Sequence, residues 1–238
     1  MNIRYWWIVI TYILVQFSVL LGVPLLLSLG VSRTQAFGIW SIFSFTIGLV
    51  IILILLIPDI RERHLVRGRS TRGEAIRWSL IGIALVFGAQ YAAALIESVV
   101  LGIEPGSQNT QDIVEIAKAF PAFILIVSII GPILEEIVFR KVLFGALYKR
   151  FNFGIAALVS SLIFAVVHMD FIHLLIYTAM GFAFAFLYVK TKRIIVPIIA
   201  HVSINLFVAV VQVVFADQLE EMIENLEQTA SIIFGGIL

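Results

Sequence analysis

GPILEEIVFR, residues 131–140, places two carboxylates and an arginine inside a long apolar run that extends from Ile113 to Leu147. An ionised side chain near the centre of a bilayer costs about 2.5–3.5 kcal/mol on insertion scales. Charges so close together would weaken the insertion of the segment that carries them. If the chain lies in a membrane, their presence predicts a function that offsets this cost.

Composition identifies the chain as an integral membrane protein. Of its 238 residues, 61% are hydrophobic and 13% are charged, and the mean hydropathy is +1.10. Soluble domains average about 45–50% apolar and about 25% charged residues. The chain contains no cysteine, which excludes disulfides and cysteine-ligated zinc. Its formal net charge of +1 gives no indication of a nucleic-acid partner.

Seven apolar stretches predict membrane-spanning helices, which need roughly 20 residues each. They are Tyr5–Leu29, Ala36–Ile57, Ile76–Leu101, Ile113–Leu147, Phe153–Met169, Ile172–Tyr188 and Ile194–Phe215. The fourth is overlong, so we interpret it as an amphipathic lead-in joined to a span, with a bend near Gly131-Pro132. A last apolar piece, Ala230–Leu238, is short for an eighth span. The predicted fold is an all-α, polytopic bundle of seven to eight transmembrane helices.

The charges of the loops predict the orientation of the bundle. The loop between the second and third spans is rich in arginine from Arg61 to Arg77, and basic clusters also follow the fourth and sixth spans. Such loops stay cytoplasmic, so we expect a multi-pass protein of the cell membrane with a cytoplasmic N-terminus. We divide the chain into N-terminal helices with this basic loop (1–112), a core (113–215), and an acidic tail (216–238) with room for a short eighth helix.

Polar side chains inside three of the spans are the candidates for a functional site. They are Glu135, Glu136 and Arg140 in the fourth span, His168 in the fifth, one turn after Phe164, and His201 and Asn205 in the seventh. An ion pair between Glu136 and Arg140 could be purely structural. Buried ionisable groups nevertheless converge on one another or on water. A carboxylate, two imidazoles and an amide together suit the activation of a water molecule.

Two further polar residues receive a structural interpretation. His173 lies near a span end, and we expect its ring to bond a backbone carbonyl. Glu97 lies close to the outer interface of the membrane, and we expect it to be solvated.

Three motifs, in this order on three helices, resemble those of the CPBP family. They are EExxxR from Glu135 to Arg140, FxxxH from Phe164 to His168, and HxxxN from His201 to Asn205. That family comprises the CAAX proteases and bacteriocin-processing enzymes, is also called the Abi family, and includes the eukaryotic type II CAAX prenyl endopeptidase. The resemblance covers roughly residues 120–215.

The resemblance implies an intramembrane endopeptidase that hydrolyses a peptide bond of a membrane-associated protein or peptide, with a site that opens towards the cytoplasm. It implies that Glu135 and His168 hold and deprotonate a water molecule, while His201 and Asn205 face the developing oxyanion. These are the groups that peptide hydrolysis requires.

Three more residues would support this site. Glu136 with Arg140 would orient the helix and hold Glu135 in place, and Phe164 would form a wall beside the imidazole of His168.

The sequence leaves the participation of a metal open. The family has been described both as metalloproteases and as glutamate-dependent proteases. Two histidines and one glutamate match a catalytic zinc site with a fourth position for water. If zinc or another divalent cation is bound, its ligands would be Glu135, His168 and His201. No HExxH motif is present, and a mechanism without a metal is the alternative.

Two other functions also stay open. The first is a non-catalytic membrane scaffold or bacteriocin-immunity protein that uses the same bundle. The second is a proton-coupled transporter whose buried glutamates and histidines form a relay. Transporters more often have inverted repeats or paired broken helices, and we find none in the sequence. The sequence specifies neither the substrate nor the oligomeric state.

Overall fold

The computed structural model describes residues 2–104 and 106–215, and every regular element in these residues is a helix. The predicted all-α fold is therefore confirmed. In chain order the elements are α1 (Ile3–Phe17), α2 (Val19–Ser28), α3 (Arg33–Leu55), α4 (Ile57–Arg61), η1 (Glu62–Leu65), α5 (Arg72–Val99), α6 (Gln108–Ala119), α7 (Phe123–Leu125), η2 (Ile126–Ile130), α8 (Gly131–Glu135), η3 (Glu136–Phe144), α9 (Gly145–Tyr148), α10 (Phe153–Val167), α11 (Leu174–Thr191) and α12 (Ile195–Val214).

Five helices in the described residues are long and apolar enough to cross a membrane. They are α1 together with α2, then α3, α5, α11 and α12. The predicted number of seven to eight is not confirmed. Of the other two predicted spans, α10 has only 15 residues, and the stretch from α7 to α9 is divided by the π-helical elements η2 and η3. The apolar piece Ala230–Leu238 lies outside the described residues.

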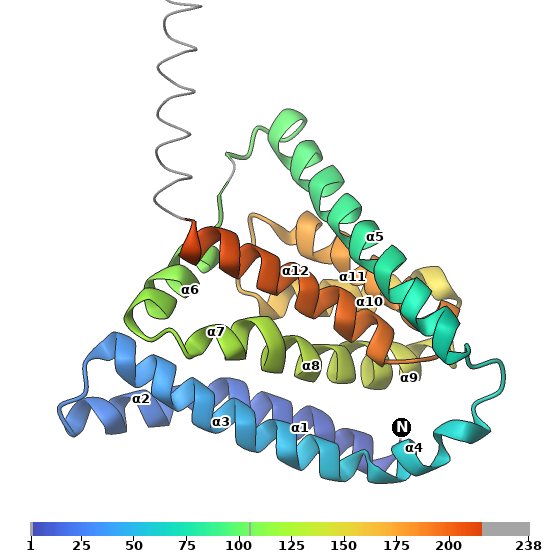
Figure 1. Cartoon of the computed structure of the whole chain (residues 1–238), viewed down its shortest axis with the longest axis horizontal. Coiled ribbons are helices and arrows are strands. Elements are labelled where there is room, and N and C mark those ends of the chain that lie inside the picture. Colours follow the sequence, from blue (N-terminus) through green and yellow to red (C-terminus); the bar gives the residue numbers. More distant parts are fainter. Residues whose placement is uncertain (1, 105, 216–238) are drawn as a thin grey trace, which may run out of the picture.

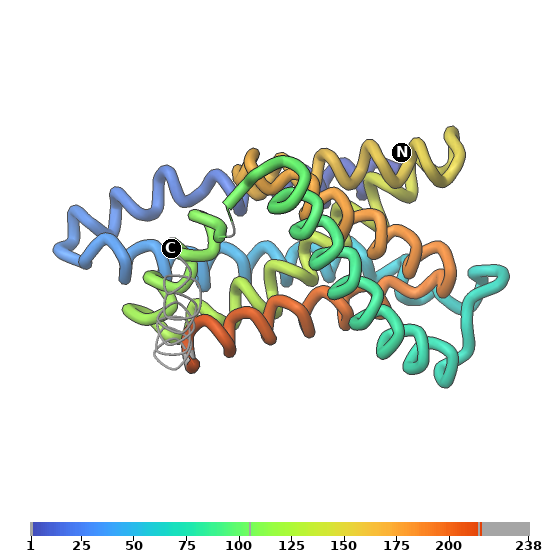
Figure 2. The backbone as a smooth tube through the Cα atoms, turned by 90° about the horizontal axis from the view of Figure 1, so that it is seen from above, coloured from blue at the N-terminus to red at the C-terminus, as the bar shows by residue number. Residues whose placement is uncertain are grey.

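The stretch from α7 to α9 lies at the centre of the bundle. Element η2 contacts α3 on one side and α12 on the other, as Figure 1 shows. Helices α1 and α2 pack on α3, while α11 packs on α5, α10 and α12. Helix α5 is inclined to α12 in both views, and the two diverge towards their C-terminal ends (Figures 1 and 2).

The predicted bend near Gly131-Pro132 is wrong in its position. The amphipathic lead-in, α6, ends at Ala119, and the chain turns at residues 120–122 before α7. At Gly131-Pro132 the helix continues, flanked by π-helical turns in η2 and η3. Proline has no N–H to donate to the preceding turn, and a π-helical turn is one way in which a helix absorbs such a defect.

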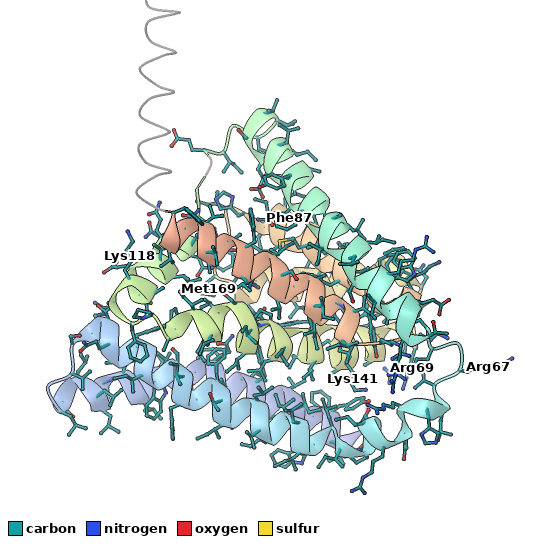
Figure 3. The ribbon with its side chains drawn as sticks, viewed as in Figure 1. Arg67, Arg69, Phe87, Lys118, Lys141 and Met169 are labelled. Carbon is teal, nitrogen blue, oxygen red and sulfur yellow. The ribbon has the colours of Figure 1, made fainter. Side chains whose placement is uncertain are left out.

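Charge distinguishes the two ends of the bundle. Figure 3 shows Arg67, Arg69 and Lys141 at one end, and Lys118 and Met169 towards the other. We call the first the basic end; it carries the N-terminus, the α4–α5 loop, the C-terminus of α9 and the α11–α12 turn. The other is the distal end, with the α2–α3 turn, the α5–α6 and α10–α11 loops and the C-terminus of α12. Of the 16 lysines and arginines, all but Arg33, Lys118 and the buried Arg140 lie at the basic end.

An ion-pair cluster ties the basic end together. Arg4 and Lys141 lie 3.4 and 3.0 Å from the carboxylate of Asp59 in α4, and the Tyr5 hydroxyl donates to the same group. Partial burial opposes the charge of Asp59, but the hydrogen bonds from Tyr5 and Lys141 outweigh it and lower the pKa of Asp59. The cluster joins α1, α4 and η3 across the bundle.

Candidate active site

A buried carboxylate, Glu136, joins two helices at the centre of the site. Its Oε1 lies 3.1 Å from Nδ1 of His201 in α12, and its Oε2 lies 3.4 Å from Nε of Arg140. The side chains of Glu136 and Arg140 have no exposed surface, and that of His201 is 2% exposed. An ionised carboxylate can only accept hydrogen bonds. The Nδ1–H group of His201 is therefore the donor of this hydrogen bond, and Glu136 is the acceptor. In the structure, Glu136 therefore contacts Arg140 and His201.

Aromatic rings surround the guanidinium of Arg140. Its central carbon lies 4.8 Å from the ring centroid of Phe164 and 5.6 Å from that of Phe184, which is cation–π geometry. Its nitrogens have no hydrogen-bond partner among the described residues, so the contact with Glu136 is one of charge only. The two residues therefore depend on each other, because each would be a buried, unpaired charge without its partner.

Glu135 faces the other side of the His201 ring. Its Oε2 lies 3.7 Å from Nε2 of His201, which is too long for a direct hydrogen bond. Because Nδ1 donates to Glu136, Nε2 of the neutral ring has a lone pair. When the ring is neutral, two acceptors thus face each other at this distance; a proton shared between them, or a donor that bridges them from the side, would satisfy both.

The ring of His168, at the end of α10, is held from two sides. Its Nδ1 lies 2.8 Å from the carbonyl oxygen of Phe164, so Nδ1 is protonated and Nε2 of the neutral ring is free. The ring of Phe164 lies edge-on at 4.5 Å, where the sequence predicted a wall. A second wall, Tyr177 in α11, lies at 4.2 Å with its ring tilted by 30°. The contact of Tyr177 with His168 was not predicted from the sequence, because one aromatic residue in an apolar helix gives no distinguishing signal.

The side chain of Asn205 donates to a backbone carbonyl of η2 that lacks its helical partner. The Gly131 N–H donates to the Ile126 carbonyl, five residues earlier. In the same pattern the Val127 carbonyl would need a donor from Pro132, which has none. Asn205 Nδ2 donates to this carbonyl at 3.0 Å. The contact uses one amide hydrogen of Asn205 and fixes its side chain between α12 and η2.

All four residues predicted for catalysis, Glu135, His168, His201 and Asn205, line one cavity of about 650 Å³. From these residues the cavity extends to the distal end, where α6, the α5–α6 loop and the last turns of α12 line it. The described cavity therefore opens at the end of the bundle opposite the N-terminus, whereas the sequence predicted a cytoplasmic N-terminus together with a cytoplasmic opening.

The three residues named as ligands for a metal are not assembled as a ligand set. The described residues contain no group of three His, Cys, Asp or Glu side chains placed to hold a metal ion. Glu135 and His201 approach each other, whereas the Nδ1 of His168 is engaged with a backbone carbonyl. As placed in the described residues, these three side chains do not form a three-ligand zinc site.

A buried pair at the distal end corrects the interpretation of Glu97. Glu97 is 2% exposed rather than solvated, because its carboxylate binds Nδ1 of His173 at 2.7 Å and accepts from the Ile176 N–H at 3.3 Å. The Nε2 of His173 lies 2.7 Å from the carbonyl oxygen of Gly106, which confirms the predicted backbone bond. Partial burial opposes the charge of the ring, but the hydrogen bonds to Glu97 and Gly106 outweigh it and raise the pKa of His173.

Known proteins resemble this chain over the whole bundle. The family model described as "Type II CAAX prenyl endopeptidase Rce1-like" matches residues 117–207, which include every candidate residue. "Putative membrane peptidase YdiL" of Bacillus subtilis (strain 168) is 43% identical over 245 residues, which cover 100% of this chain and 99% of that protein. "Membrane-embedded CAAX protease MroQ" of Staphylococcus aureus (strain USA300) is 38% identical over 227 residues, which cover 91% and 92%. No solved structure matches.

The apolar helices and these relatives define the class of protein, a helical membrane peptidase. The chain belongs to the Rce1-like CAAX protease family. This confirms the resemblance that the three motifs indicated.

Proposed function

We propose that this protein is an intramembrane endopeptidase that hydrolyses a peptide bond of a membrane-associated protein or peptide through a water molecule activated by Glu135 and His168. The observation that carries the proposal is the cavity that these two residues share with His201 and Asn205. Membership of a CAAX protease family supports a peptidase.

The attacking water lies beside Glu135 in this mechanism. The Glu135 carboxylate takes a proton from the water as its oxygen adds to the carbonyl carbon of the scissile bond. The free Nε2 of His168 accepts the second hydrogen of the same water, since Nδ1 is committed to the Phe164 carbonyl. A positioned general base of this kind contributes about 10²- to 10⁴-fold to the rate.

Two other groups stabilise the oxyanion that this addition forms. Asn205 has a second amide hydrogen beyond the one given to the Val127 carbonyl. His201 takes up a proton from solvent before the reaction, donates it in a hydrogen bond from Nε2 to the oxyanion, and keeps it throughout, while Glu136 at Nδ1 stabilises the imidazolium. The proton held by Glu135 then passes to the amide nitrogen. The C–N bond breaks, which leaves a carboxylic acid and a free amine.

The test uses purified protein in liposomes with a membrane-tethered peptide. Glu135→Ala is expected to lower kcat/KM by about 10²- to 10⁴-fold. Little change in unfolding temperature is expected, because among the described residues Glu135 has no ion pair with an arginine or lysine. Glu115→Ala is the matched control, since Glu115 is an exposed carboxylate in α6 outside the cavity lining.

Cleavage that survives both Glu135→Ala and His168→Ala would place the activity elsewhere or in a contaminant. If the parent cuts no peptide and Glu135→Ala also leaves the cellular phenotype unchanged, the scaffold alternative replaces the peptidase.

A further inference from the structure

Among the described residues, the lining of the cavity leads from the candidate residues to the distal end of the bundle. None of its lining residues belongs to the arginine-rich loop 61–72, to residues 149–152 or to the turn at 190–194, which together form most of the basic end. Its lining at the distal end includes Ser107, Thr110 and Gln212. Water or a peptide therefore has a path to Glu135 from the distal end.

The depth of the cavity sets the length of what it can hold. Both His201 and Val213 line it, and α12 rises about 18 Å between them at 1.5 Å per residue. An extended peptide advances about 3.3 Å per residue. The scissile bond of a bound peptide would thus lie about five to six residues below the distal rim.

The chemistry of the lining indicates what kind of segment fits. Apart from Glu135 and three histidines, the described residues that line the cavity carry no charged side chain. Uncharged polar groups are spread among the apolar ones: Gln16, Ser41, Ser44, Gln90, Asn109, Thr110 and Gln212. Such groups offer hydrogen bonds to a peptide backbone, which needs partners once it leaves water. A charged side chain in the same place would lose its hydration without an opposite charge to pair with.

The rim of the cavity also borders the lipid. Tyr91 in α5 and Phe207 in α12 line the cavity, yet they are 65% and 50% exposed. Both belong to helices that are long and apolar enough to cross a membrane, so we infer that this part of the rim lies beside lipid. Helices α5 and α12 diverge towards this end (Figures 1 and 2). A peptide anchored in the adjacent leaflet can reach the rim without leaving the membrane.

The basic end marks the cytoplasmic side by the distribution of lysine and arginine, so the distal end faces away from the cytoplasm. We propose that the substrate is an uncharged, extended segment of a membrane-anchored protein or peptide that reaches the site from the extracytoplasmic leaflet. This inference rests on the proposed peptidase function and reverses the cytoplasmic opening expected from the sequence.

Cysteine labelling tests the open side. The chain has no cysteine, so Thr110→Cys, in the cavity lining, needs no altered background. Arg67→Cys is the control, because Arg67 is exposed in the basic loop and outside the lining. A charged, membrane-impermeant maleimide is expected to label Thr110→Cys on intact cells and Arg67→Cys only in inverted membranes. Labelling of both from the same side, or of Thr110→Cys from neither side, overturns the proposal.

Cleavage by the same variants tests the route of the substrate. A bulky maleimide on Thr110→Cys is expected to slow cleavage at least about tenfold against the same variant unlabelled. The same label on Arg67→Cys should leave cleavage unchanged. Equal cleavage by labelled and unlabelled Thr110→Cys would show that substrate takes another path. If the parent cuts nothing, the peptidase proposal fails, whereas the labelling pattern still decides which side is open.

A pair of tethered reporter peptides tests the nature of the segment. Both carry one apolar anchor with the cleavage region on the extracytoplasmic side, and one has a lysine three residues from the scissile bond. The uncharged reporter is expected to be cut at least about tenfold faster. Equal rates would contradict the requirement for an uncharged segment.

Discussion

Replacement of Arg140 by methionine is expected to destabilise the protein by about 3–5 kcal/mol. Methionine keeps apolar contact with the rings of Phe164 and Phe184, which lie 4.8 and 5.6 Å from the guanidinium carbon. It removes the positive charge 3.4 Å from Glu136, a carboxylate with no exposed surface. Glu136 then remains buried with His201 as its only hydrogen-bond partner in the described residues. Its charge, and not a loss of volume, is the source of the cost.

A second substitution separates charge from packing. Glu136→Gln alone leaves the arginine buried and unpaired, and a loss of similar size is expected. In the double variant both charges are gone, while the new amide oxygen can still accept from Nδ1 of His201. Replacing a buried ion pair with neutral residues is often neutral or stabilising. The double variant should therefore lie within about 1 kcal/mol of the parent. With single losses of about 3 kcal/mol or more each, this corresponds to a coupling energy of at least about 5 kcal/mol.

The assay is reversible unfolding in mixed detergent micelles, together with cleavage of a tethered peptide. The Arg140→Met variant should lose cleavage along with stability, because His201 is oriented by Glu136. The double variant should recover stability and part of the cleavage. If the loss in the double variant equals the sum of the two single losses, the residues are not coupled and the reasoning is wrong.

Other expected outcomes concern packing, pH and a metal. Gly181→Ala should lower the free energy of unfolding by about 1–3 kcal/mol, because the Cβ of the alanine would lie 2.6 Å from the side chain of Ser161. The measurement is unfolding in mixed detergent micelles. An unchanged free energy would mean that α10 and α11 shift easily. The pKa of His173 is raised by its hydrogen-bond partners. The stability that His173 contributes is therefore full below about pH 6.5 and is lost as pH rises through the pKa of the folded state. The unfolding temperature should fall over this pH range in the parent and not in His173→Gln. Asn205→Ala should lower kcat about 10²- to 10³-fold, and unchanged kcat would remove it from the oxyanion site. Cleavage should persist when a chelator is present and no zinc is added. If the chelator abolishes cleavage and a divalent cation restores it, the mechanism without a metal is contradicted.

The sequence predicted the fold class, and it named four residues that the structure brings to one cavity. Hydropathy and charge act locally along the chain, so apolar stretches and the basic loops are visible without a structure. The pairing of Glu136 with Arg140 follows from helix geometry alone. The convergence of Glu135, His168, His201 and Asn205 was inferred from the cost of burying such groups in a bilayer. The contact of His201 with Glu136 was not predicted, since spacing along the chain carries no information across helices.

Other features depend on backbone geometry that side-chain patterns do not encode. The π-helical turns follow from hydrogen bonds that shift by one residue, so neither η2 nor η3 was predicted. Glu97 was placed by counting residues from the span end. The α5–α6 loop folds back over that end, where Gly106 bonds the same histidine that Glu97 does. A tertiary contact of this kind buries a side chain that its position near the end of a span would leave exposed to water.

The order of the elements along the chain bears on how the bundle assembles during synthesis. The helix that carries Glu136 and Arg140 leaves the ribosome before α10, α11 and α12, yet the rings beside these two charges come from these three helices: Phe164, Phe184 and His201. Until they arrive, the two charges have only each other and surrounding water, and the helix partitions poorly into lipid on its own. Stable insertion of this helix therefore has to wait for the C-terminal half of the protein. A nascent chain halted before α12 would expose a degradable, half-inserted intermediate, which gives the cell a checkpoint on completion of the active bundle.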